Sequence, residues 1–399
     1  MPRFGRSHVN SDPEVTLPFR AEIGMIPTPK PNPSTFRVMN QLARMKQVAT
    51  ALSLLSLLAA PTVLAAQKDV IFFTDGTVIR NVKVMSWTAK EIKFKTKGSV
   101  DVRPSFMVKD ALVKKIREAL LRAEDDPSVL ITEAETHKAD ALISSYALHK
   151  AAMLFLEDGK TSDMIAALQK IDTDFPESPF APEYYRWKIK YYLGRKKPDH
   201  KSAATVAVKY GDASRTRSWT QAYQHDSNYW EKLIEGTAGK VQPSTFTTNM
   251  RNIVSKSSTV APFVAHAAAV ELADTYRKLQ KYDEAKKEYT ALQDMKGLSV
   301  DVRARMYLGL GYISLENAIS AKKETARKDA YHEAYKNFLR VYLNAKGANA
   351  EFVAEGLYNA AKACEQWNEL SNCRAMAGRL RGRLKFREPY KHTKWATKK

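Results

Sequence analysis

The feature that most constrains this chain is a helical spacing of apolar residues that starts at Asp110 and continues almost to the C-terminus. From Ala111 to Leu121, apolar side chains recur as they do on one face of an α-helix. Glycine and proline interrupt the pattern at short intervals, for example at Pro127 and Gly159. Because neither residue is favoured inside a helix, the pattern predicts many short helices joined by short breaks. Such a chain is expected to be mainly α and built from repeated units.

The clearest repeated unit is residues 267–297, which read AAAVELADTYRKLQKYDEAKKEYTALQDMKG. Small residues stand where two antiparallel helices would approach most closely, and larger residues flank them. In the first helix the small residue is Ala273, flanked by Leu272 and Tyr276. In the second helix it is Ala285, followed by Tyr289 and Leu292. The pattern resembles the tetratricopeptide repeat, a helical pair of about 34 residues. The resemblance implies a tetratricopeptide-like (TPR-like) α-solenoid of helical hairpins that binds protein partners in a groove lined by first helices.

Neighbouring segments carry weaker versions of the same pattern. In RARMYLGLGYISLENA, Leu308, Gly309 and Tyr312 occupy the first-helix positions, so GLGY is interpreted as helix packing and not as a phosphate-binding loop. The polar AISAKKETARKD that follows predicts two lengthened helices. The resemblance extends loosely over 145–385, although no repeats are assigned between 195 and 260.

Before the helices, residues 69–103 alternate apolar and polar side chains in the manner of β-strands. Turn sequences that contain Asp75-Gly76 and Lys97-Gly98 separate the runs and predict four or five short strands. The pattern resembles the Sm-like or SH3-like β modules that follow the signal peptide in many bacterial envelope proteins. This resemblance implies a small β-barrel-like interaction module and supplies no catalytic residue.

Residues 45–66 have a positive flank, an apolar run and small residues at the end, which describe a secretory signal peptide. The segment is either cleaved or retained as a membrane anchor. The preceding residues 1–44 are rich in proline. Their apolar residues follow neither the two-residue period of a strand nor the 3.6-residue period of a helix, so this segment is expected to be disordered. Met45 is an alternative start, in which case 1–44 is a mis-assigned extension. The predicted location is the periplasm or cell envelope.

The predicted segments follow from these patterns. They are a disordered extension (1–44), a signal peptide or anchor (45–66), a β module (67–109), connecting helices (110–144), TPR-like repeats (145–385) and a basic tail (386–399).

The net charge of +21 favours polyanionic partners, and much of the excess lies near the C-terminus. Basic residues interleaved with aromatic ones can follow an anionic polymer, a lipid surface or a nucleic acid. A solvated tail without a ligand is the alternative. The candidate polyanion-binding residues are Arg379, Arg381, Arg383, Lys385, Arg387, Lys391 and Lys394.

The sequence contains no motif that points to catalysis or to a cofactor. There is no HExxH, no GxSxG and no phosphate-binding glycine loop, and the eight histidines are scattered. We therefore expect no enzyme activity, no cofactor, no metal site and no small-molecule substrate. Cys364 and Cys373 belong to no metal-type pair but could form one disulfide in an oxidising compartment.

The expected function is that of an exported adaptor or scaffold that binds protein partners of unknown identity. The alternatives are a binder of anionic cell-wall polymer, lipid or nucleic acid through the basic segment, and an envelope enzyme on a helical scaffold. Tyrosine and tryptophan are common at protein interfaces, although they also pack the cores of repeats. The candidate partner-binding residues are Tyr184, Tyr185, Trp187, Lys188, Tyr191, Lys278, Tyr307, Tyr312 and Asn359.

Overall fold

A computed structural model of the chain describes residues 68–74, 77–121, 123, 125–345 and 348–384. The predicted extension 1–44, the signal segment 45–66 and the basic tail 386–399 lie outside the described residues, as does the Asp75-Gly76 turn. Within the described part, no helix is both long enough and apolar enough to cross a membrane.

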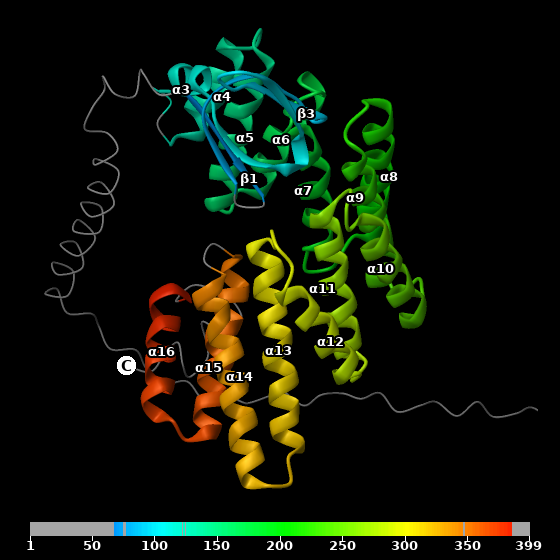
Figure 1. Ribbon diagram of the computed structural model, residues 1–399, viewed down its shortest axis with the longest axis vertical. Helices are drawn as coiled ribbons and strands as arrows, with labels where there is room; N and C mark the ends of the chain where they lie inside the picture. The colour runs from blue at the N-terminus through cyan, green and yellow to red at the C-terminus, as the bar shows by residue number, and fades with distance from the viewer. Residues whose placement is uncertain (1–67, 75–76, 122, 124, 346–347, 385–399) are drawn as a thin grey trace, which may run out of the picture. The chain divides into compact units, whose positions relative to one another are not determined.

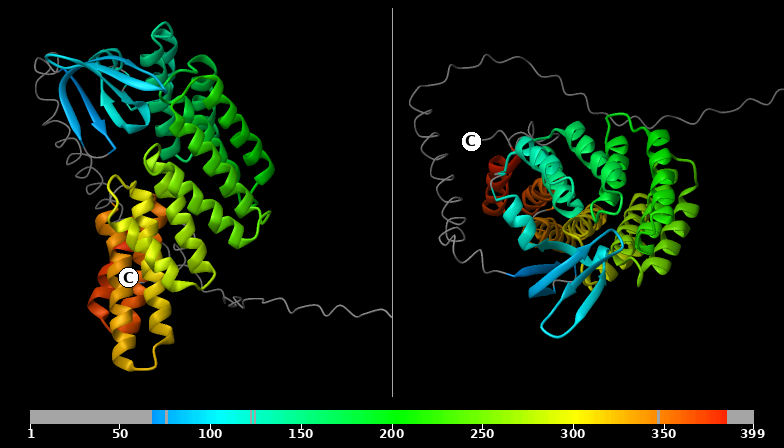
Figure 2. Two further views of the ribbon diagram at one scale, coloured as in Figure 1. Left: turned by 45° about the vertical axis from the view of Figure 1, so that its right-hand side comes forward. Right: turned by 90° about the horizontal axis from the view of Figure 1, so that it is seen from above.

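The described chain begins with a five-stranded antiparallel sheet in the order β4-β3-β2-β1-β5 (Figure 2). The strands are β1 (Asp69–Phe73), β2 (Val78–Trp87), β3 (Glu91–Lys95), β4 (Val100–Pro104) and β5 (Val108–Leu112), with the 3-10 turn η1 (Ser105–Met107) before β5. The alternation in the sequence determines which face is buried. Ile71, Val82, Ile92 and Phe94 fill the inner side of the sheet and are almost fully buried.

The strand β5 runs past the predicted boundary at residue 109, where helices were expected to begin. Ala111 and Leu112 fit a helical spacing and a strand alternation equally well. Their backbone pairs with β1, whose other edge pairs with β2, so these two residues belong to the sheet. Among the described residues, the first α-helix therefore starts at Lys114.

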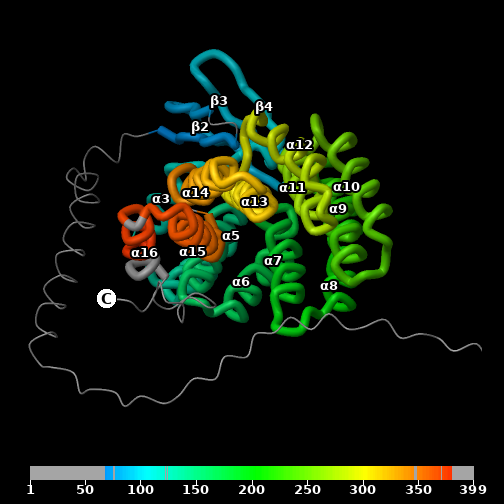
Figure 3. Tube along the Cα trace, turned by 90° about the horizontal axis from the view of Figure 1, so that it is seen from below, coloured from blue at the N-terminus to red at the C-terminus, as the bar shows by residue number. Residues whose placement is uncertain are grey.

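The remaining described residues are mainly α-helical and confirm the predicted fold class. The helices are α3 (Lys114–Ala119), α4 (Pro127–Thr136), α5 (Ala141–Glu157), α6 (Thr161–Asp174), α7 (Ala181–Leu193), α8 (His200–Thr216), α9 (Gln221–Thr237), α10 (Pro243–Ser257), α11 (Pro262–Lys278), α12 (Tyr282–Gln293), α13 (Val300–Ser320), α14 (Glu324–Asn344), α15 (Ala350–Trp367) and α16 (Leu370–Leu384). From α4 onward each helix packs on the next, so that helical hairpins follow one another in chain order (Figures 1 and 3). The segments 195–260, where no repeat could be assigned, form α8, α9 and α10 in the same series.

Small residues lie where the helices approach most closely, as the repeat pattern predicts. Ala273 and Ala285 are fully buried between α11 and α12. A Cβ atom on Gly309 would collide with the Tyr289 ring, which confirms the packing role of the GLGY segment. The polar segment after it forms the end of α13 and the start of α14, and each of these helices is 21 residues long.

The sheet packs against the first helices of the series. The amide N–H of Ala89 donates to the carbonyl of Glu177 at 2.8 Å. The Trp87 ring lies edge-on to Phe180, with 5.4 Å between the ring centroids. A common hydrophobic core therefore joins the sheet to the helices up to α9.

Two further cores follow along the chain. One fills the space between α9 and α13, and the other joins α13 and α14 to α15 and α16. Neighbouring hairpins thus share their buried surfaces with one another, as expected of a helical repeat array.

Candidate functional site

A cavity of about 550 Å³ lies between the β sheet and the first helices of successive hairpins. It is lined by β2, η1, β5 and the residue after β1 on the side of the sheet, by α5, α7, α9 and α11 among the helices, and by the turn before α7. Its wall is rich in aromatic rings, which gives it a large apolar surface. These rings belong to Trp87, Phe106, Tyr146, Phe180, Tyr223 and Phe263.

One side of the cavity is formed by Arg186, whose position is fixed from several directions. Its Nε donates to Asp226 Oδ2 at 2.6 Å and its Nη1 to Glu183 Oε1 at 2.8 Å. The guanidinium also lies over the rings of Tyr223 and Phe263, 5.3 and 4.9 Å from their centroids. The wall of the cavity therefore carries a rigid, already paired cation.

The partners of Arg186 decide its charge state. Burial alone would lower the pKa of this guanidinium, but the carboxylates of Asp226 and Glu183 outweigh it and raise the pKa well above its usual value. Asp226 is held in turn by Tyr210, whose hydroxyl donates to Asp226 Oδ2 at 2.7 Å. This arrangement joins α7, α8 and α9 through buried polar contacts.

His149 in α5 faces the same cavity. Its ring is stacked on Phe180 at 4.5 Å between centroids, with 19° between the planes. Burial lowers the pKa of His149, while the nearby carboxylates of Glu183 and Asp110 oppose that change. The imidazole is therefore neutral near pH 7 and contributes to the cavity as an aromatic surface.

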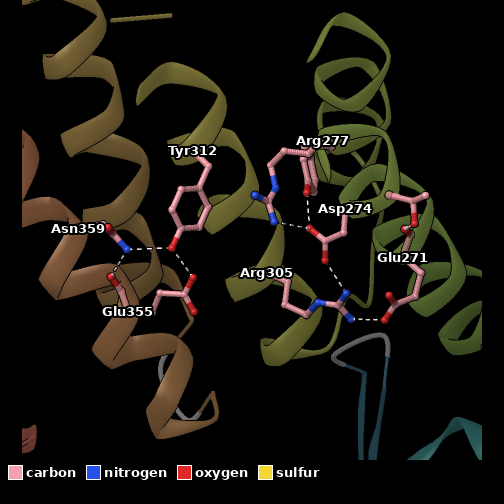
Figure 4. A network of polar contacts seen from close by, with 9 residues as sticks. Glu271, Asp274, Arg277, Arg305, Tyr312, Glu355 and Asn359 are labelled. Carbon is pink, nitrogen blue, oxygen red and sulfur yellow. Dashed lines mark hydrogen bonds and ion pairs between the residues drawn. The ribbon is translucent and has the colours of Figure 1, made fainter. Parts of the chain in front are cut away.

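A second polar network links the later first helices α11, α13 and α15 (Figure 4). Arg305 in α13 donates from Nη1 to Glu271 Oε1 at 2.6 Å and from Nη2 to Asp274 Oδ2 at 2.5 Å, and both acids belong to α11. The Tyr289 hydroxyl donates to Asp274 as well. Since Arg305 pairs with two carboxylates at once, it fixes the relative position of α11 and α13.

The network continues through two of the predicted partner-binding residues. Tyr312 in α13 donates to Glu355 Oε1 in α15 at 2.5 Å and accepts from Asn359 Nδ2 at 3.0 Å. The guanidinium of Arg277 lies 4.9 Å from the centroid of the Tyr312 ring. Tyr312 and Asn359 thus connect first helices to one another, in a partly buried position.

The other predicted partner-binding residues fall in different environments. Tyr184 and Tyr185 are 8% and 6% exposed, and Tyr185 stacks on Tyr210 within the core. Half-buried side chains on α7 are those of Trp187, Lys188 and Tyr191; Tyr307 is half-buried on α13 and Lys278 is exposed at the end of α11. The partner-binding role of these residues stays a prediction.

The α7 residues that line the cavity, Glu183 and Arg186, were not among the residues predicted from the sequence. They follow Phe180 at intervals of three residues, a spacing that places all three on one side of the helix. The tyrosines next to them in the sequence face the core. The spacing of Phe180, Glu183 and Arg186 could therefore have predicted which side of α7 faces the cavity.

Among the predicted polyanion-binding residues, Arg379 is described. It is exposed on α16, with its guanidinium 5.2 Å from the centroid of the Tyr342 ring. Arg381 and Arg383 belong to α16, but their side chains lie outside the description, and Lys385, Arg387, Lys391 and Lys394 fall beyond the described residues.

The two cysteines lie on neighbouring helices, Cys364 in α15 and Cys373 in α16. Both are buried, and the disulfide that the sequence left open is not formed in this structure. Burial, with a smaller contribution from Cys373, raises the pKa of the Cys364 thiol to about 12. No group of three or more His, Cys, Asp or Glu that could hold a metal ion occurs within the part of the chain that the structure describes.

No protein-family model matches the chain, and no curated protein matches it by sequence. Among solved structures it is similar to a Signal Transduction ATPase with Numerous Domains protein with a tetratricopeptide repeat sensor from Pyrococcus horikoshii. That match has 14% identity and a TM-score of 0.42, and covers 67% of this chain and 41% of that one. It is also similar to the apo form of the quorum sensor NprR from B. thuringiensis, at 14% identity and a TM-score of 0.41, over 69% and 77% of the two chains. The chain thus spans less than half the length of the first of these structures.

Proposed function

We propose that this chain is a non-catalytic scaffold that holds an extended segment of a partner protein in the cavity between the β sheet and helices α5, α7, α9 and α11. The observation that carries the proposal is the wall of that cavity, which is aromatic on both the sheet side and the helix side. Aromatic side chains provide large contact areas at a low entropic cost and are enriched at protein-binding hot spots.

The charged groups of the cavity support a positioning role. Arg186 is already paired with Asp226 and Glu183, so it can orient a bound backbone carbonyl without first losing its own partners. The neutral His149 and the rings around it suit apolar side chains of the partner. We therefore propose a segment with apolar or aromatic anchors as the bound element.

The location of this activity is also a proposal. The signal segment 45–66 and the likeness of the β module to modules of bacterial envelope proteins support export to the cell envelope, either free or anchored by residues 45–66.

The test is affinity capture from a native envelope fraction on the immobilised full chain. Met153→Glu places a charge in the cavity from α5, whereas Val208→Glu makes the same change at an exposed position of α8. We expect Met153→Glu to lose the captured proteins by about tenfold or more, since a carboxylate would be desolvated against the aromatic wall. Val208→Glu should retain them, provided that both variants show the melting temperature of the wild type.

Equal capture by the wild type and Met153→Glu would exclude the cavity as the binding site. A further chain that lacks residues 379–399 tests the rival function through the basic tail. Binding through the tail depends on salt. If the truncated chain captures much less than the wild type, and added salt reduces capture by the wild type to the same extent, the tail and not the cavity is responsible.

A further inference from the structure

A second cavity, of about 570 Å³, lies at the β sheet beside the start of α3. Its floor includes the buried side chains of Val82, Val84 and Val113. Around that floor the lining is dominated by lysine. The lysines are Lys68, Lys83, Lys95, Lys97, Lys114 and Lys115.

The two acids in the lining do not balance these lysines. Asp69 is 6% exposed, and its two carboxylate oxygens accept the backbone amides of Val84 and Lys114, both at 2.6 Å. Glu118 pairs with Lys114 at 3.5 Å. Lys115 pairs with Asp140 at 2.8 Å. Asp69 therefore holds the backbone in place, Glu118 compensates Lys114, and Asp140 from outside the lining compensates Lys115.

The other four lysines, Lys68, Lys83, Lys95 and Lys97, form no ion pair with any residue in the described part of the chain. They are all exposed, so their ammonium groups can move toward a ligand. The cavity thus carries several uncompensated positive charges within the volume of one small molecule.

The register of the sheet adds an independent observation. Lys83 in β2 and Lys95 in β3 are direct partners across the antiparallel pair. Like charges at directly opposite positions destabilise a sheet, so the fold itself gains nothing from this pair. An anion between the two ammonium groups would turn the repulsion into attraction on both sides.

We propose that this cavity binds a ligand that carries two or more phosphate groups. Lysine is a common phosphate binder, and four uncompensated lysines match a multiply charged group better than a single carboxylate. The volume lies within the range of sites for small molecules, roughly 300–1,000 Å³. The apolar floor can accept the carbon part of the ligand. The site is separate from the aromatic cavity and does not depend on the function proposed there.

The test uses calorimetric titration of the full chain with inorganic pyrophosphate at low salt. Lys83→Gln/Lys95→Gln removes the opposed pair, and Lys286→Gln/Lys287→Gln on the exposed side of α12 removes the same charge elsewhere. We expect the first variant to bind pyrophosphate at least about tenfold more weakly, and the second to bind like the wild type. The first variant should unfold at the same urea concentration or a higher one, because a repulsion has been removed.

Absence of pyrophosphate binding by the wild type, or an equal loss in both variants, would overturn the proposal, since the second result indicates attraction to net charge alone. Because every chain carries the same basic tail, a contribution from the tail cancels in the comparison. Sedimentation with phosphatidylcholine vesicles that contain a diphosphorylated lipid identifies the source. Sedimentation that pyrophosphate reverses assigns the site to a lipid headgroup, and pyrophosphate binding without sedimentation assigns it to a soluble ligand.

Discussion

Individual glycines determine how closely the helices of this chain can approach. Gly309 and Gly311 lie two residues apart on α13, yet they face different neighbours. Gly309 lies against the Tyr289 ring of α12 and Gly311 against the Phe338 ring of α14. One helix therefore accepts an aromatic ring from each adjoining helix, and both rings are fully buried.

Gly309→Ala should destabilise the chain, because its methyl group would collide with the Tyr289 ring. We expect a loss of about 1–3 kcal/mol in the free energy of unfolding, measured by urea denaturation. Gly378→Ala in α16 is the matched control, since a Cβ atom there meets nothing within 4 Å. The control should be neutral or stabilising by up to about 1 kcal/mol, as alanine is the better helix former. Equal losses in both variants would show that the Tyr289 contact is not the cause.

The stability of the chain should depend on pH through His149. Burial lowers the pKa of this residue in the folded chain, against the opposing effect of Glu183 and Asp110. Protons therefore bind the unfolded chain more readily, and the free energy of unfolding falls as the pH drops below about 6.5, the usual pKa of histidine. His149→Phe keeps an aromatic ring against Phe180 and removes the titrating group.

The measurement is urea unfolding at about pH 7.5 and about pH 5.5. We expect a smaller loss of stability on acidification for His149→Phe than for the wild type. Burial lowers the pKa values of His225 and His266 as well, so part of the pH dependence should remain in the variant. A pH dependence unchanged by the substitution would contradict the assignment to His149.

At the scale of the elements, first helices are connected to one another by polar contacts as well as by apolar packing. Arg186 joins α7 to α9, and Arg305 joins α11 to α13. Tyr312 then joins α13 to α15. A misaligned helix would leave these groups without partners in a partly buried position, so the contacts select one alignment of the hairpins.

The sequence was most informative where local spacing decides the structure. Ala273, Ala285 and Tyr289 identified the α11–α12 hairpin because their positions within one short segment determine how its two helices meet. The aromatic cavity was not predicted, since it forms between the sheet and several helices. On α7 the sequence favoured Tyr184 and Tyr185, but the neighbouring hairpin covers them and leaves the adjacent face open.

At the scale of the whole described chain, the interior consists of three successive cores. The first joins the sheet to the early hairpins, and the last lies between α13 and α16. In such an array stability is approximately a sum of contributions from each repeat and from its contacts with neighbours. A defect in one core should therefore open its own region first.

Phe338→Ala tests this expectation, because Phe338 is fully buried in the last core. The substitution should cost about 3–5 kcal/mol locally and accelerate amide hydrogen exchange in α13 to α16. The amides of α5 to α8 should exchange at the rate of the wild type. Leu168→Ala in the first core is the reciprocal control and should reverse the pattern. Faster exchange throughout the chain in both variants would instead show a single cooperative unit.

The contact between the sheet and the early helices has a consequence for how such an array can lengthen during evolution. Helical repeats gain members by duplication, and a new hairpin must stack on an uncovered helix pair. Here Trp87 packs on Phe180, and the Ala89 amide is hydrogen-bonded to the Glu177 carbonyl, so the sheet already covers part of the helical surface. An extra hairpin placed between the sheet and the turn that joins α6 to α7 would have to break these contacts. Duplications are therefore expected to be tolerated farther along the array, where each hairpin contacts others of its own kind.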